Sequence, residues 1–181
     1  SFMQHVCAAN MARLPNTAIY TAVLNERGTY ESDVTAHRIS VCHYRVFTGT
    51  NAIKRDLAWF HLHAEGFDVT LRDSTEEYSV LGLMGPEASR IISAVGASEL
   101  NEVGYFKIGE ARIVGKHVRA VRMSYVAEAG WEITVNATDV ISVYKALVAE
   151  GAVPAGLYAQ TSMRIEKGFA AMGHELDSDI T

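Results

Sequence analysis

The chain has 181 residues, of which 49% are hydrophobic and 20% are charged, a composition typical of one globular domain or two small lobes. Its 16 basic and 21 acidic residues give a net charge of −5, which disfavours sequence-independent binding to nucleic acid. No apolar run approaches the roughly 18 residues that a membrane helix needs, and no secretory signal pattern is present. We therefore expect no nucleic-acid or membrane partner, and a cytoplasmic location, or a mitochondrial-matrix location in a eukaryote.

The cysteines and histidines do not form a pattern typical of a disulfide framework or a metal site. Cys7 and Cys42 have no CxxC spacing, and we interpret both as small apolar packing residues in a reducing compartment. His61 and His63 lie two residues apart, which places them on different faces of a helix. We therefore expect no metal site.

The first part of the chain predicts an apolar, helix-like segment at 1–10, then a small sheet and a longer helix. Alternating and β-branched residues predict three strands: 17–24, 30–40 and 43–49. Four apolar residues then recur at helical spacing: Ile53, Leu57, Phe60 and Ala64. Asn51 can cap this helix, and Gly66 ends it.

The remainder predicts further strands and helices in alternation. Strands are expected at 67–73, at 76–85, on both sides of the "VGKH" turn between residues 104 and 126, and at 129–136. Helices are expected at 85–96, with Pro86 in the first turn, at 137–151 and at 157–168. Four residues are expected to form the buried face of the second of these helices: Val140, Val143, Tyr144 and Leu147.

Short turns between successive strands favour antiparallel pairing. The sequence therefore predicts an α+β fold, with antiparallel or mixed sheets and flanking helices, rather than a doubly wound parallel sheet. We divide it into two interleaved α+β lobes, 1–76 and 77–181.

Three polar features qualify as candidate functional groups. They are Tyr20 and Asp33 on either side of the tight turn in "LNERGTYESDVT", Glu128 in the small-residue turn of "SYVAEAGWEI", and the charged helix residues Arg164, Glu166 and Lys167. A carboxylate in a half-buried strand, such as Asp33, is costly to desolvate without a partner. Each feature taken alone also fits a solvated surface.

Taken together and in this order, the segments resemble the glycine-cleavage T-protein (aminomethyltransferase) superfamily. They are most similar to the folate-binding region of dimethylglycine and sarcosine dehydrogenases. The matching sequence segments are "IYTAVLNERGTYESDVTAHRI", "FTGTNAIKRDLAWFHLH", "LGLMGPEASRII", "MSYVAEAGWEITV" and "GLYAQTSMRIEKGFAAMGHELD". The resemblance covers essentially the whole chain.

The resemblance implies a site for tetrahydrofolate-dependent one-carbon transfer. In it, Tyr20 would line the folate cavity, Asp33 would be the catalytic residue beside the reacting nitrogens, Glu128 would hold the pterin ring and Arg164 would contribute to the ligand site. A pterin presents a ring N–H beside an exocyclic amine, and one carboxylate can accept both hydrogen bonds. A preorganised carboxylate can also stabilise developing positive charge and orient an attacking amine.

Several positions depart from the family pattern. Ala127 stands where the family usually has glycine, and Ser32–Asp33 stands where it has two aspartates. The resemblance implies the first two domains, both incomplete, of a three-domain fold, without its C-terminal barrel. We therefore expect a fragment that is inactive by itself, binds folate weakly, and forms homo-oligomers through apolar surfaces exposed by truncation.

Two functions remain open at this point. The first is an enzyme module that moves a one-carbon group from a small amine or iminium substrate to tetrahydrofolate, as in a methylated-glycine dehydrogenase. The second is a non-catalytic folate-capture or regulatory module beside a flavoprotein domain. In either case FAD would come from a separate domain, and the sequence does not identify the one-carbon donor.

Overall fold

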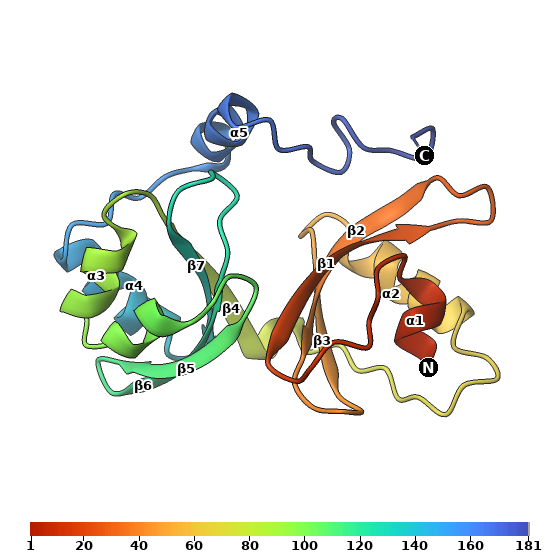
Figure 1. Cartoon of the computed structure of the whole chain (residues 1–181), viewed down its shortest axis with the longest axis horizontal. Coiled ribbons are helices and arrows are strands. Elements are labelled where there is room, and N and C mark those ends of the chain that lie inside the picture. The colour runs from red at the N-terminus through yellow and green to blue at the C-terminus, as the bar shows by residue number, and fades with distance from the viewer. Residues whose placement is uncertain (181) are drawn as a thin grey trace. The chain divides into compact units, whose positions relative to one another are not determined.

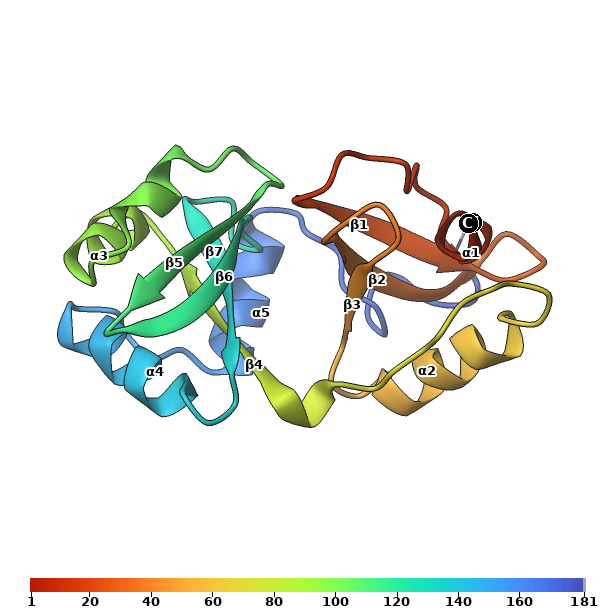
Figure 2. The same ribbon diagram turned by 90° about the horizontal axis from the view of Figure 1, so that it is seen from below.

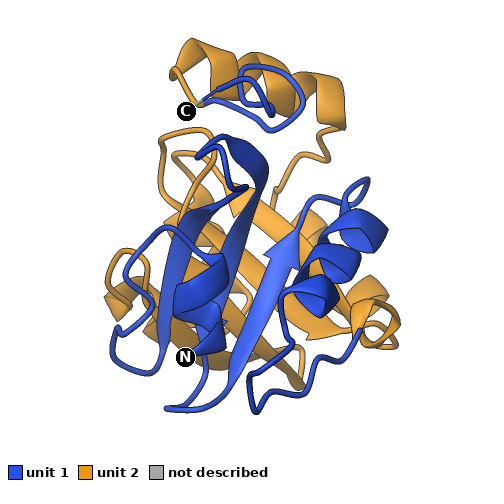
Figure 3. Ribbon diagram, turned by 90° about the vertical axis from the view of Figure 1, so that its right-hand side faces the viewer, with its two compact units in different colours: residues 1–73, 170–181 blue, residues 74–169 orange. Residues whose placement is uncertain are grey.

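The computed structural model, which describes residues 1–180, shows an α+β chain with antiparallel sheets and flanking helices (Figure 1). The fold class predicted from the sequence is confirmed. The chain divides into two compact units: unit 1 consists of Ser1–Asp73 and Ala170–Thr181, and unit 2 consists of Ser74–Phe169 (Figure 3). In the described part of the chain, no helix has the length and apolar character needed to cross a membrane.

Unit 1 is built on a three-stranded antiparallel sheet in the order β1-β2-β3. Its strands are β1 (Thr17–Leu24), β2 (Tyr30–Arg38) and β3 (Tyr44–Thr48). Helices α1 (Phe2–Val6) and α2 (Ile53–Leu62) cover one face of this sheet (Figures 1 and 2). The turn between β1 and β2 contains Gly28, whose φ of 78° suits a residue without a Cβ.

The core of unit 1 lies between the sheet and the two helices. Side chains of β1 and β2 alternate between the faces, so every second residue points into this core. The buried cluster includes Phe2, Ile19, Val23, Val34, Ala36 and Phe60. The alternate residues of the same strands, Tyr20 and Asp33 among them, lie on the opposite face.

Unit 2 is built on a four-stranded antiparallel sheet in the order β4-β7-β6-β5. Its strands are β4 (Tyr78–Met84), β5 (Ile108–Ile113), β6 (Lys116–Arg122) and β7 (Gly130–Asn136). Its α-helices are α3 (Ala88–Ala94), α4 (Val140–Ala149) and α5 (Leu157–Glu166). Two short 3₁₀ helices, η1 (Thr75–Glu77) and η2 (Ser98–Glu102), were not predicted.

The core of unit 2 lies where α3 and α4 pack on one face of the sheet (Figures 1 and 2). Its most deeply buried side chains include Ile92, Leu100, Ile113, Val118, Trp131, Ile133 and Val143. The indole N–H of Trp131 donates to the carbonyl oxygen of Leu100 at 3.3 Å, so the largest core residue leaves no polar atom unpaired.

The expected strand at 67–73 is wrong. These residues have no partner strand among residues 1–180 and form an extended loop. Phe67 packs edge-on against Phe2, with ring centroids 5.7 Å apart, and Leu71 contacts the same core. The alternating pattern therefore reflects apolar contacts of a loop, because a strand exists only where a neighbour completes its hydrogen bonds.

Three single-residue expectations are also wrong. Helix α2 begins after Ala52 without a side-chain cap, so Asn51 lies one residue too early to cap it. Tyr144 is 41% exposed, because the buried face of α4 is centred on Val143 and Leu147. Cys7 is buried as expected, but Cys42 is exposed.

Candidate functional site

Tyr20 and Asp33 lie together on the face of the unit 1 sheet that points away from its core. Ala22 is directly opposite Asp33 and Tyr20 is opposite Thr35, so Tyr20 and Asp33 are diagonal neighbours on one face. The Tyr20 hydroxyl donates a hydrogen bond to Asp33 Oδ2 at 2.9 Å. The carboxylate in the strand is therefore partnered from the adjacent strand, as this register requires.

This pair leaves the carboxylate able to accept further hydrogen bonds. Tyr20 is 47% exposed and Asp33 is half-buried. An ionised carboxylate has about four lone-pair positions, of which the Tyr20 hydroxyl uses one. Asp33 can accordingly accept from an N–H group or stabilise a positive charge placed beside it.

A buried polar cluster fixes strand β2 next to Asp33. Asp56, in the first turn of α2, is only 3% exposed and accepts a hydrogen bond of 2.6 Å from Ser32 Oγ. Thr48 of β3 also donates to the Asp56 carboxylate, and the Arg55 guanidinium pairs with it at 3.0 Å. Because Ser32 precedes Asp33, this cluster ties the strand that carries Asp33 to both β3 and α2.

Glu128 lies in the loop 123–129, between β6 and β7. Ala127 has a φ of 61°, in the left-handed region that glycine adopts most easily, which accounts for the glycine usual at this position in the family. A Cβ on Gly130 would come within 2.9 Å of both the Met123 carbonyl oxygen and Met84 Cγ. The loop is thus sharply folded, and it presents Glu128 with 46% of its side chain exposed.

Two side-chain contacts join this loop to the end of α5. Lys167 Nζ lies 3.2 Å from Glu128 Oε1, and the rings of Tyr125 and Phe169 stack with centroids 5.8 Å apart. Lys167 is one of the candidate charged residues of this helix, but its contact with Glu128 was not predicted from the sequence. The signal for that contact is the opposite charge of two residues in segments that the resemblance places at one site.

Arg164 is 2% exposed, unusually buried for an arginine. Its Nη1 donates to the carbonyl oxygen of Phe169 at 2.8 Å, which closes the turn that follows α5. Its expected contribution to a ligand site stays a prediction.

The four predicted site residues fall into two groups. Tyr20 and Asp33 are in contact in unit 1, whereas Glu128 and Arg164 belong to unit 2 and contact different residues at the end of α5. That Asp33 and Glu128 serve one ligand stays a prediction.

Glu132 is a further carboxylate near the Glu128 loop. It lies on β7, is half-buried, and burial raises the pKa of its carboxyl group above the usual value. Sequence patterns did not indicate this residue, because a glutamate within an alternating strand is usually solvated.

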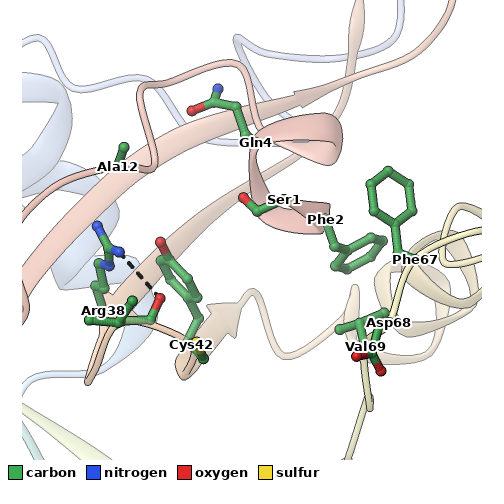
Figure 4. A pocket seen from close by; sticks show the side chains of 11 residues that line it. Ser1, Phe2, Gln4, Ala12, Arg38, Cys42, Phe67, Asp68 and Val69 are labelled. Carbon is green, nitrogen blue, oxygen red and sulfur yellow. Dashed lines mark hydrogen bonds between the residues drawn. The ribbon is translucent and has the colours of Figure 1, made fainter.

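A pocket of about 570 Å³ lies within unit 1, and neither Tyr20 nor Asp33 lines it (Figure 4). The Arg38 guanidinium donates to the backbone carbonyls of Arg13, Ser40 and Val41, and the Tyr44 hydroxyl donates to that of Met11 at 2.7 Å. Phe2, Phe67 and Val69 supply apolar walls. The polar groups of Arg38 and Tyr44 in this lining are thus already engaged with the backbone.

Within residues 1–180, no group of three or more histidine, cysteine, aspartate or glutamate side chains has a geometry that could hold a metal ion.

Comparisons with known proteins give a consistent picture. The chain is 34% identical to an aminomethyltransferase from Rubrobacter xylanophilus, over 99% of this chain and 48% of that protein. It is 33% identical to an aminomethyltransferase from Thermus thermophilus, over 99% of this chain and 52% of that protein. The chain therefore spans about half the length of the curated relatives it matches.

A solved structure has the same fold. The crystal structure of glycine cleavage system aminomethyltransferase T from Bartonella henselae superposes with a TM-score of 0.85 and 24% sequence identity, over 98% of this chain and 48% of that one. The family model described as the GCVT N-terminal domain matches residues 1–181. This chain therefore belongs to the GCVT N-terminal domain family, the family of the glycine-cleavage T-proteins.

Proposed function

We propose that this chain is the folate-binding part of a tetrahydrofolate-dependent aminomethyltransferase. The proposal is supported by the family match over the whole chain and by the named relatives. The observation that carries it is the hydrogen bond from Tyr20 to Asp33 on the outward face of the unit 1 sheet. A structural role alone does not call for an oriented carboxylate on that face.

The residues present fit the chemistry of a reduced folate. Its pterin ring offers an N–H beside an exocyclic amine, and the half-exposed Glu128 carboxylate can accept from both. Arg164, buried at the end of α5, is proposed as a member of the same ligand site. When bound, tetrahydrofolate would supply the nitrogens that accept the one-carbon unit.

Asp33 is the proposed catalytic residue. The Tyr20 hydroxyl orients its carboxylate and uses one oxygen, which leaves the other free to accept a proton or a hydrogen bond from an amine. A fixed negative charge would also lower the energy of a transition state in which positive charge develops, because no reorganisation is needed at that moment.

The sequence segments are most similar to the folate-binding region of flavoprotein dehydrogenases. This similarity favours a methylated glycine, dimethylglycine or sarcosine, as the source of the one-carbon unit. FAD would then be supplied by a separate domain. The alternative is a non-catalytic folate-capture or regulatory module beside a flavoprotein domain. It would bind folate without accelerating transfer, so single-turnover formation of methylene-tetrahydrofolate separates the two.

The proposal is tested with Asp33→Asn and Glu128→Gln in the full-length protein. We expect Asp33→Asn to lower single-turnover transfer by about 100-fold or more with little change in folate affinity, since charge stabilisation at a reacting centre is typically of this size. Glu128→Gln should instead weaken folate binding by about tenfold, because a charge-assisted contact is lost. Glu31→Gln, on a neighbouring residue of β2, is the control. Unchanged transfer with Asp33→Asn would refute the catalytic role.

A further inference from the structure

The loop that carries Glu128 is held in place by the segment that follows α5. The contacts are the ion pair between Lys167 and Glu128, at 3.2 Å, and the stacking of Tyr125 on Phe169. One is polar and one is aromatic, and they fix the loop at positions three residues apart. The loop conformation therefore depends on where α5 ends.

The end of α5 is itself fixed by hydrogen bonds. Lys167 is the C-terminal cap residue of the helix, and Gly168 has a φ of 75°, which turns the chain back. The Phe169 amide donates to the Arg164 carbonyl oxygen at 2.9 Å, and Arg164 Nη1 donates to the Phe169 carbonyl oxygen at 2.8 Å. A buried arginine thus holds the turn that presents Lys167 and Phe169 to the loop.

The ion pair does not block Glu128. Lys167 approaches only Oε1, and a carboxylate has about four lone-pair positions on its two oxygens. Both oxygens can still accept from a pair of parallel donors. Because the Glu128 side chain is 46% exposed, its rotamers would be largely free without this contact, and a ligand would have to order them on binding.

We propose that Lys167 is a positioning residue that orients the Glu128 carboxylate for its ligand, a reduced pterin. This inference rests on the proposed function of Glu128. Lys167 acts through Glu128 and does not itself recognise the pterin ring. Its loss should therefore weaken binding only of ligands that use the Glu128 contact.

The test compares Lys167→Met with the parent chain by NMR titration of 5-formyltetrahydrofolate, a stable reduced folate. A half-exposed ion pair contributes little, so we expect the dissociation constant to rise about two- to fivefold. Lys167→Arg should restore most of the affinity, because the charge and reach are kept. Lys145→Met, on the exposed side of α4 in the same unit, removes the same charge and should leave the affinity unchanged.

Two further measurements separate orientation from a merely structural role. Hydrogen exchange of the amides in loop 123–129 should accelerate in Lys167→Met but not in Lys145→Met, with global stability unchanged. A folate analogue without the exocyclic 2-amino group keeps only the ring N–H as a donor to Glu128, so it should lose less affinity on Lys167→Met than 5-formyltetrahydrofolate does. Equal losses for both ligands would overturn the positioning role, because the effect would then not pass through Glu128.

The remaining outcomes distinguish this inference from the function on which it rests. If Glu128→Gln weakens binding but Lys167→Met does not, the inference is wrong and the proposed function stands. Tighter binding by Lys167→Met would also overturn it, since Lys167 would then compete with the ligand. If the parent chain does not bind, or Glu128→Gln binds as the parent does, the proposed role of Glu128 fails and the inference fails with it.

Discussion

Asp56 is a buried carboxyl group with three side-chain partners, Ser32, Thr48 and Arg55, and its replacement tests how the strand beside Asp33 is held. Asp56→Asn would turn an amide toward the Arg55 guanidinium and weaken the bonds from Ser32 and Thr48. Because Asp56 is buried but the Arg55 side chain is 47% exposed, the change mainly leaves the Ser32 and Thr48 hydroxyls with a weaker acceptor, and we expect a loss of about 1 to 2 kcal/mol in the free energy of unfolding.

Urea denaturation followed by circular dichroism measures this loss. Asp68→Asn, an exposed aspartate of the same unit, is the control and should change stability by less than about 0.5 kcal/mol. A loss equal to that of the control would mean that the Asp56 cluster contributes nothing to the fold.

At this scale, the sequence predicted what depends on local patterns and missed what depends on distant partners. The tight turn placed Tyr20 and Asp33 in one hairpin, but the hydrogen bond between them was not predicted from the sequence. Asp56 could not be identified, since its partner Ser32 lies 24 residues earlier in the sequence. The positive φ of Ala127 likewise could not be predicted from its own residue type. The only signal for it was that the family usually has glycine at this position.

Among the structural elements, the β5–β6 hairpin contains the clearest conflict between residue and backbone. Its two-residue turn has φ values of 45° at Val114 and 77° at Gly115, the pattern of a type I′ turn. Glycine suits the second position, but a β-branched residue is strained at the first. We expect Val114→Asn to raise the free energy of unfolding by about 1 kcal/mol, because asparagine tolerates this conformation.

Thermal or urea unfolding gives the measurement for this hairpin. Val153→Asn is the matched control, because Val153 is also exposed but has no left-handed backbone. An unchanged or lower stability for Val114→Asn, with the control unaffected, would contradict the assignment of strain to the turn.

The hairpin also shows what periodicity can and cannot predict about elements. The glycine of "VGKH" located its turn correctly, and each predicted α-helix is present in the structure. The segment 67–73 has an equally good alternating pattern but no adjacent strand. Pairing is a property of the tertiary structure, so a pattern within one segment cannot establish it.

At the scale of the whole molecule, the two units differ in how they are assembled from the sequence. The core of unit 2 is drawn from residues 83–147, within one continuous segment. Unit 1 also includes the C-terminal segment, where the Tyr30 amide donates to the carbonyl oxygen of Ile180 at 3.1 Å and Arg27 donates to that of Ser178. No composition change or periodic pattern marks this return, so the sequence did not indicate it.

This difference predicts that residues 74–169 fold alone. The segment forms a complete four-stranded sheet with helices on one face, and its core side chains need no residue from outside it. Its length is also close to that of common independent domains. We expect a cooperative thermal transition, and dispersed NMR resonances for core residues such as Trp131 and Ile133 that match those of the whole chain.

The isolated segment 74–169 is compared with a separately produced segment 1–73, which lacks the C-terminal partners of Tyr30 and Arg27. It should be less stable than the same residues within the whole chain, because the hairpin between β1 and β2 loses these two hydrogen bonds. A non-cooperative transition with strong dye binding for 74–169 would show that the unit 2 core is insufficient by itself. Such a result would make unit 2 dependent on the rest of the chain, despite its continuous core.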